Sequence, residues 1–174
     1  DLVKNTCNNV YVSTIQQYLK EYDNRSNKEI LSDIYKYMSK HYRNEYFYQN
    51  TLLNKLLLGR HSIKTTTALS QVPIERSKAD FILINGKAVV YEIKTELDTF
   101  DRLATQLSDY YKAFNHVCVV TCEENFEKIS EILKNTKVGI CILSEANTLQ
   151  FKKEAEPNNE HLNHSSLFKI LRKY

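Results

Sequence analysis

The sequence predicts an α/β fold in which a mixed central sheet is preceded by a helical segment. The first third of the chain places Leu, Ile, Tyr and Phe at helical intervals, whereas the remainder alternates apolar runs of strand length with amphipathic stretches. Two largely apolar runs, 79–84 and 87–93, are joined by Asn85-Gly86, a pair typical of hairpin turns. With 42% hydrophobic residues in 174, the chain is long enough to bury one sizeable core.

Three amphipathic helices are expected at the start of the chain, over residues 9–22, 27–42 and 44–58. We expect Asn27 to cap the second helix, which carries an apolar stripe, and Gly59 to end the third. Residues 60–70 predict a polar connection or a weak strand through 65–67. Pro73 favours the end of an edge strand, because proline donates no hydrogen bond to a sheet.

After the hairpin, residues 99–114 predict a helix with Leu103, Leu107, Tyr110 and Phe114 on one face. The remaining elements are expected to be a strand at 117–121, a helix at 123–135, strands at 138–143 and 148–152, a loop at 154–165 and a helix at 166–173. From residue 44 on, the core therefore has the element order αβββαβ. We expect a helical appendage at 1–43, the core at 44–153, and a loop with a C-terminal helix at 154–174.

Composition and charge narrow the class of protein only slightly. The net charge is +3, but residues 1–76 hold 11 basic and 7 acidic side chains, so the N-terminal part is the better candidate for a phosphate-facing surface; ordinary solvated helices would explain the same excess. The four cysteines have no metal-binding spacing, which predicts reduced thiols without disulfides. No run of about 18 apolar residues and no leader pattern occurs, so we expect no membrane span and no secretory leader in this chain.

The hairpin carries the most informative residues in the chain. Asp80, Glu92 and Lys94 interrupt its apolar strands, and buried charges are costly unless they are paired or bound to a cation. Hard cations such as Mg²⁺, or Mn²⁺ in its place, take carboxylate and carbonyl oxygens, so we expect Asp80, Glu92 and the carbonyl of Ile93 to be metal ligands. Lys94, two residues after Glu92, points to the same face and would orient an attacking water.

A metal site shared by Asp80 and Glu92 requires the hairpin to place both side chains on the same face of the sheet. A two-residue turn at Asn85-Gly86 would place Asp80 opposite Tyr91, with Glu92 on the other face of the sheet. An odd-length loop, with Gly86 in the left-handed conformation, returns Asp80 and Glu92 to one face. Both strands are apolar on both faces, so the hydrophobic pattern does not choose between them; we predict the odd loop because the chemistry needs it.

These residues resemble the PD-(D/E)XK nuclease superfamily. Asp80 and the Glu92-Ile93-Lys94 string match its motif, although Lys78-Ala79-Asp80 lacks the proline for which the motif is named. The similarity in sequence extends from about residue 44 to residue 121. Gln106 and Tyr110, four apart on the next helix, resemble the Gln-x-x-x-Tyr element of the RecB-like branch. The resemblance implies that Glu45, on an early helix, joins the site and that Gln106 and Tyr110 support it.

The function implied by this resemblance is Mg²⁺-dependent endonuclease activity, with DNA favoured over RNA as substrate. Two settings fit, both with a site of action in the cytoplasm of a bacterial cell: a bacterial defence or mobile-element protein, or a domain of a larger secreted polymorphic toxin, which would bind a cognate immunity protein. The chain begins at Asp1 and its only methionine is Met38, which favours a piece of a longer polypeptide. One alternative is a toxin that cleaves RNA, in particular tRNA. The other is a module on the same fold that binds nucleic acid or protein without cutting it, in which Asp80, Glu92 and Lys94 form a structural ion pair.

Other candidate sites are weaker. His161 and His164 have a spacing compatible with a metal ion on a helix, but they lie in a polar segment without an acidic or thiol partner nearby in the sequence. Cys118 and Cys122 flank an apolar strand, where core packing explains them better than catalysis. Tyrosines clustered between residues 35 and 48 would stack on nucleic-acid bases or, more commonly, pack helices together.

Overall fold

The computed structural model describes residues 25–59 and 64–171 of the protein. It divides into two compact units, residues 1–47 and 48–174. The described elements are α3 (Asn27–His41), α4 (Glu45–Leu52), η1 (Leu53–Leu58), β1 (Thr67–Ile74), β2 (Ser77–Asn85), β3 (Lys87–Lys94), α5 (Leu103–Tyr111), β4 (His116–Thr121), α6 (Phe126–Ile132), β5 (Gly139–Leu143), β6 (Leu149–Lys153) and α7 (His164–Leu171). The helix expected at 9–22 lies outside the described residues.

The first unit contains α3, the helix predicted at 27–42. Its cap is Ser26 rather than Asn27: the Ser26 hydroxyl accepts a hydrogen bond from the Glu29 N–H, and the Glu29 carboxylate accepts one from the Ser26 N–H at 2.9 Å. The prediction was wrong by one residue because this reciprocal box satisfies two free N–H groups of the first turn. Within the unit, the Tyr35 and Phe47 rings pack 5.4 Å apart, which agrees with the packing role for one of the clustered tyrosines.

The helix predicted at 44–58 is present, with two backbone geometries. It is α-helical over Glu45–Leu52 and becomes a π-helix, η1, over Leu53–Leu58, before ending at Gly59 as expected. A wider helical turn of this kind is uncommon and leaves no signature in the hydrophobic pattern. The sequence therefore predicts the extent of this helix but not its change of geometry.

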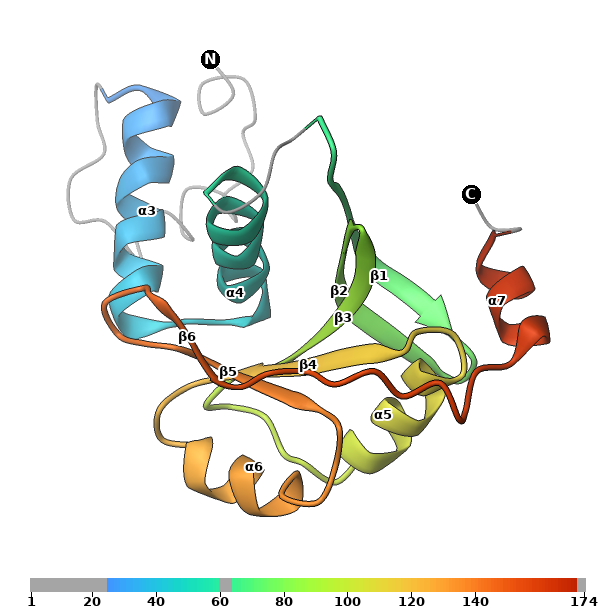
Figure 1. The fold of residues 1–174 in the computed structure, drawn as a ribbon. Helices are drawn as coiled ribbons and strands as arrows, with labels where there is room; N and C mark the ends of the chain where they lie inside the picture. The colour runs from blue at the N-terminus through green and yellow to red at the C-terminus, as the bar shows by residue number, and fades with distance from the viewer. Residues whose placement is uncertain (1–24, 60–63, 172–174) are drawn as a thin grey trace. The chain divides into compact units, whose positions relative to one another are not determined.

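The second unit is built on a six-stranded mixed sheet, which confirms the predicted fold class (Figure 1). The strands lie in chain order from β1 to β6; β1, β2 and β3 are antiparallel neighbours, β3, β4 and β5 are parallel, and β6 is antiparallel to β5. Each parallel pair is joined through a helix, α5 or α6, as parallel connections require. Pro73 lies near the end of the edge strand β1, as predicted.

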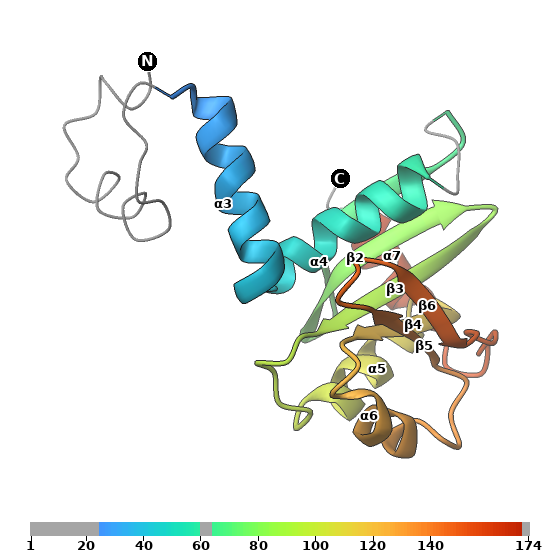
Figure 2. The same cartoon turned by 90° about the vertical axis from the view of Figure 1, so that its left-hand side faces the viewer.

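Helices α5 and α6 lie on one face of this sheet (Figures 1 and 2). Their apolar side chains, including Leu103, Leu107 and Ile129, pack with Val90 and Val119 of the central strands in the main core. The hydrophobic burial of a core of this kind is the main term that stabilises such a fold. The core fixes α5 against the hairpin strands and so determines where Gln106 and Tyr110 point.

Helix α5 is shorter than the 99–114 predicted from its pattern. It begins at Leu103. Residues 95–98 form a turn in which the Asp98 carboxylate accepts hydrogen bonds at 2.8 Å from both the N–H and the hydroxyl of Thr95, and a second turn follows, in which the Leu103 N–H donates to the Phe100 carbonyl at 3.0 Å. The bounds of α6 and α7 also differ from those predicted by two to three residues. No helix among the described residues is long and apolar enough to cross a membrane.

The segment after β6 returns to the other edge of the sheet, where α7 packs beside β1 (Figure 1). Gly139 makes this path feasible, because a Cβ there would lie 2.8 Å from the backbone nitrogen of Ala155. Glu75, in the turn between β1 and β2, accepts hydrogen bonds from Ser166 at 2.7 Å and Lys169 at 3.3 Å of α7. The C-terminal helix is thereby attached to the hairpin edge.

Candidate active site

The register of the β2–β3 hairpin puts Asp80 and Glu92 on the same face. Asn85 pairs with Lys87 and Phe81 with Tyr91, so Gly86 alone turns the chain, with a φ of +70°. The pairing therefore has the odd parity predicted above, and the two-residue turn does not occur. Continued by one residue, the register sets Asp80 opposite Glu92.

The ladder between β2 and β3 opens where the carboxylates lie. The last paired residues are Phe81 and Tyr91, and beyond them the Asp80 Oδ2 accepts a hydrogen bond from the Ile93 N–H at 2.8 Å. A side chain thus replaces a strand partner for that amide. This contact ties the two strands together. It uses the N–H of Ile93, whereas the group predicted from the sequence to bind a metal is the carbonyl of the same residue.

Glu92 is the most buried charged residue of the site, with 1% of its surface exposed. Its Oε1 accepts hydrogen bonds from Gln106 Nε2 at 2.5 Å and from the Lys94 ammonium at 2.9 Å, and its Oε2 accepts one from the Tyr110 hydroxyl at 2.6 Å. Three donors compensate for the loss of water around this carboxylate. They also fix its orientation, because each comes from a rigid strand or helix.

Lys94 contacts both Glu92 and Gln106. The residue is 8% exposed; its ammonium also donates to Gln106 Oε1 at 3.0 Å, and its carbonyl accepts from the Thr121 hydroxyl of β4 at 2.8 Å. Glu92, Lys94 and Gln106 therefore each contact the other two. The i, i+2 spacing on β3 and the i, i+4 spacing on α5 bring these predicted residues together with Tyr110.

The Tyr110 hydroxyl of α5 lies close enough to both carboxylates to be affected by their charges. Burial raises its pKa far above the ordinary value of 10, and the negative charges of Glu92 and then Asp80 raise it further. The hydroxyl is fully protonated at neutral pH and lies 2.9 Å from the Lys78 carbonyl as well as 2.6 Å from Glu92. It acts as a hydrogen-bond donor that holds the start of β2 against the helix.

Glu45 is the remaining predicted site residue. It is the first residue of α4 and belongs to the first unit, whereas the hairpin and α5 belong to the second. Its contribution to the site stays a prediction. The structure brings together the other five named side chains: Asp80, Glu92, Lys94, Gln106 and Tyr110.

A scan against protein-family models matches residues 38–174 to the model described as bacteriophage P4 protein cII. The chain belongs to this family. The region matched to the phage P4 cII model includes the hairpin, α5 and the whole sheet. No curated protein and no solved structure matches the chain.

The donor set of this phage P4 cII family member fits a hard divalent cation. Two carboxylates, Asp80 and Glu92, and the Ile93 carbonyl offer oxygen ligands, and with Lys94 the three charged side chains sum to −1, which a cation would offset. Within residues 25–59 and 64–171, no cluster of three or more His, Cys, Asp or Glu has metal-binding geometry. Any ion held here would keep several waters, as Mg²⁺ commonly does.

Sequence reasoning missed a third buried carboxylate, which lies beside the site. Asp109, 5% exposed, accepts hydrogen bonds from Ser77 at 2.8 Å and from Lys112 at 2.7 Å. Burial acts to raise its pKa, but these two donors outweigh that effect and hold the pKa below the ordinary value. The signal in the sequence was an acid on the apolar side of a helix with a lysine three residues later.

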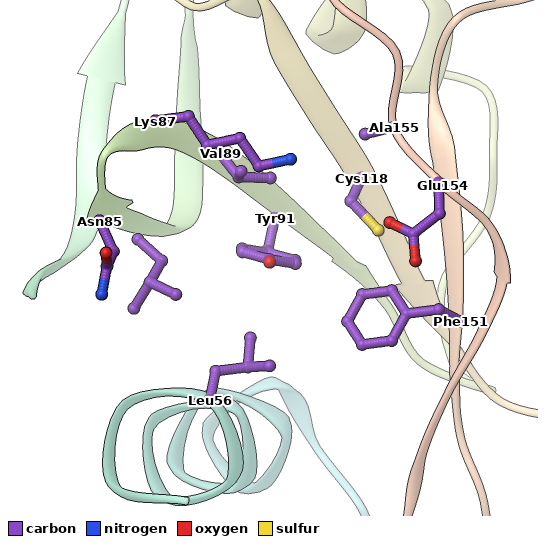
Figure 3. A pocket seen from close by; sticks show the side chains of 10 residues that line it. Leu56, Asn85, Lys87, Val89, Tyr91, Cys118, Phe151, Glu154 and Ala155 are labelled. Carbon is purple, nitrogen blue, oxygen red and sulfur yellow. The ribbon is translucent and has the colours of Figure 1, made fainter. Parts of the chain in front are cut away.

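A cavity of about 290 Å³ lies on the opposite face of the sheet (Figure 3). Leu56 of η1 faces Tyr91 of β3 across it, while Lys87 and Glu154 bring charges to its rim. Because side chains alternate along a strand, Tyr91 points away from the face that carries Glu92. This cavity is therefore separate from the carboxylate site.

Proposed function

We propose that this protein is a metal-dependent endonuclease that hydrolyses phosphodiester bonds, with DNA as the favoured substrate. The observation that carries the proposal is the convergence of Asp80, Glu92 and Lys94 on one face of the hairpin, held by Gln106 and Tyr110 of α5. A structural ion pair would need only Glu92 and Lys94. The additional carboxylate and the two helix donors support a site arranged around a cation.

Asp80, Glu92 and the Ile93 carbonyl would hold Mg²⁺, and Mn²⁺ would replace it. When bound, the metal polarises the phosphoryl group and lowers the pKa of a bound water. The chain's own part is orientation: Tyr110 and Gln106 fix the Glu92 carboxylate, and the Ile93 N–H fixes Asp80. Carboxylates fixed in this way hold a geometry without reorganising during the reaction.

Lys94 would serve as the cation at the reacting phosphate. Its ammonium has three donors; Glu92 and Gln106 accept two of them. The third would hold the attacking water or a phosphate oxygen, and the positive charge would offset charge that develops on the phosphate. Glu45 would complete the ligand set, as the superfamily resemblance implies.

The test is a cleavage assay on supercoiled plasmid and, in parallel, on total tRNA, each with Mg²⁺, Mn²⁺ or EDTA. We expect metal-dependent cutting of plasmid that falls by at least about 100-fold in both Glu92→Gln and Lys94→Ala, because each removes a group that contacts the reacting atoms. Glu145→Gln, a change of an exposed residue in the turn between β5 and β6, is the matched control.

The outcomes separate the candidates. Cutting of tRNA alone would make the protein an RNase, with the same site. Failure to cut either polymer would contradict the proposal and favour a module that binds nucleic acid or protein without cutting. Equal activity in Glu92→Gln and wild type would place the chemistry elsewhere.

The family name bears on the biological setting. Because the family model is named after a bacteriophage protein, the mobile-element setting has support beyond the sequence pattern. The alternative setting, a toxin domain, predicts that an immunity protein co-purifies with this chain when the neighbouring gene is expressed with it. Harmless expression of active wild-type protein alone would argue against a toxin.

A further inference from the structure

A groove of about 570 Å³ runs along α5 beside the turn between β1 and β2. Thr105, Ser108 and Lys112 of α5 line one side, and Glu75 and Arg76 of the turn line the other. Gln106 and Tyr110, which hold Glu92, lie on the adjacent stripe of the same helix. The groove and the carboxylate site are therefore neighbours on α5.

One cationic side chain of this groove, Arg76, is not paired with an acid among the described residues. Both of its acids already pair with a lysine: Asp109 with Lys112 at 2.7 Å and Glu75 with Lys169 at 3.3 Å, and each also accepts a hydrogen bond from a serine, Ser77 at 2.8 Å and Ser166 at 2.7 Å. Arg76 is exposed, and among the described residues its guanidinium makes no hydrogen bond or ion pair. Exposed hydroxyls of Thr105 and Ser108 add neutral donors on the facing side.

The groove adjoins the strand that carries Asp80. Arg76 lies in the turn that leads into β2, and Asp80 follows it by four residues along the chain. Ser77 bonds Asp109 and Ala79 packs in the core with α5, so the exposed Lys78 between them points to the other side of the strand and does not line the groove. The groove wall from Ala104 to Lys112 is about 12 Å long. That length matches about three nucleotide steps of 3.4 Å each.

We propose that this groove binds the sugar–phosphate backbone of the DNA strand next to the bond that is cut, with Arg76 contacting a phosphate. The inference rests on the proposed nuclease function and names the surface that holds its substrate. Guanidinium and ammonium groups pair with phosphate oxygens, and hydroxyls donate to them, so recognition there is independent of base sequence.

The test measures binding of a fluorescein-labelled DNA duplex in Ca²⁺ or EDTA, so that cutting does not intervene. Affinity is followed between about 50 and 200 mM salt, where the logarithm of the association constant falls in proportion to the number of neutralised phosphates. We expect Arg76→Gln to reduce the slope by about 0.9. Arg76→Lys should keep the wild-type slope, because it keeps the charge.

Lys152→Gln is the matched control, because this exposed lysine lies on β6 at the opposite edge of the sheet. A wild-type slope in Arg76→Gln overturns the groove as a binding surface, as does an equal loss in Lys152→Gln. If wild-type protein cuts DNA while Arg76→Gln binds like wild type, the groove fails and the nuclease function stands. If wild-type protein neither binds nor cuts DNA, both fail; binding and cutting of RNA alone would overturn the DNA assignment.

Discussion

At the scale of single residues, two adjacent tyrosines show how differently a buried hydroxyl can be used. Tyr110 donates to Glu92 at 2.6 Å and lies 2.9 Å from the Lys78 carbonyl. Tyr111 is also buried, yet among the described residues its hydroxyl finds no hydrogen-bond partner. The first hydroxyl satisfies a buried carboxylate, whereas the second is a polar group buried without compensation.

This contrast predicts opposite responses to removal of the hydroxyl. Tyr110→Phe should lower the free energy of unfolding at neutral pH by about 1–3 kcal/mol, because Glu92 loses a donor while it stays buried. Tyr111→Phe should leave it unchanged or raise it slightly, because no hydrogen bond is lost. Urea unfolding followed by circular dichroism measures both. Equal losses in the two variants would show that the 2.6 Å contact contributes nothing specific.

Alkaline pH extends the same test. Burial raises the pKa of Tyr110 far above 10 and that of Tyr111 to about 12, so above pH 10 the unfolded chain releases protons that the folded protein retains. Stability from these groups is complete below about pH 10 and is lost as the pH rises further, by up to about 1.4 kcal/mol per pH unit for each group. Each Phe variant should therefore show a shallower alkaline loss than wild type.

At the scale of elements, the hairpin determines whether a site exists. Both strands are apolar on both faces, so a shift by one residue would leave the hydrophobic pattern intact while it moved Asp80 away from Glu92. Gly86, with its φ of +70°, is what sets the register. The sequence could name the residues of the site, but their shared face was chosen by chemical argument rather than by pattern.

Substitution of Gly86 tests this role of the turn. A Cβ at this position would meet nothing within 4 Å, so the effect of Gly86→Ala is conformational strain alone. We expect it to lower the free energy of unfolding by about 1–2 kcal/mol, and Gly86→Asn by less, because asparagine tolerates positive φ better. Thermal or urea unfolding ranks the three proteins. A ranking with asparagine below alanine would contradict a left-handed conformation at the turn.

At the scale of the whole molecule, the sequence indicated the class of fold because the class depends on periodicity. It did not predict the π-helical geometry of η1 or the late start of α5, since these depend on backbone and side-chain contacts such as Asp98 with Thr95. The groove beside α5 was missed for a related reason. Its parts, Arg76 and Thr105, lie far apart in the sequence and meet only through the fold.

The proposed metal site makes a prediction for the stability of the whole protein. An ion that binds only the folded state at 100 times its Kd stabilises it by about 2.7 kcal/mol, which for a chain of this size raises Tm by about 5–10 °C. Mg²⁺ or Mn²⁺ should give such a shift in wild-type protein and EDTA should abolish it. Asp80→Asn should remove the shift, because one of the two carboxylate ligands is lost.

Asp109→Asn separates metal binding from a general effect of removing a buried carboxylate. Asp109 is buried and hydrogen-bonded like Asp80, but its partners are Ser77 and Lys112 rather than the proposed ligands. The variant should begin from a lower Tm, since two donors lose a charged acceptor, and still respond to the metal as wild type does. Equal metal shifts in wild type, Asp80→Asn and Asp109→Asn would mean that the ion binds elsewhere, and Asp80, Glu92 and Lys94 would then be a structural charge cluster rather than a catalytic one.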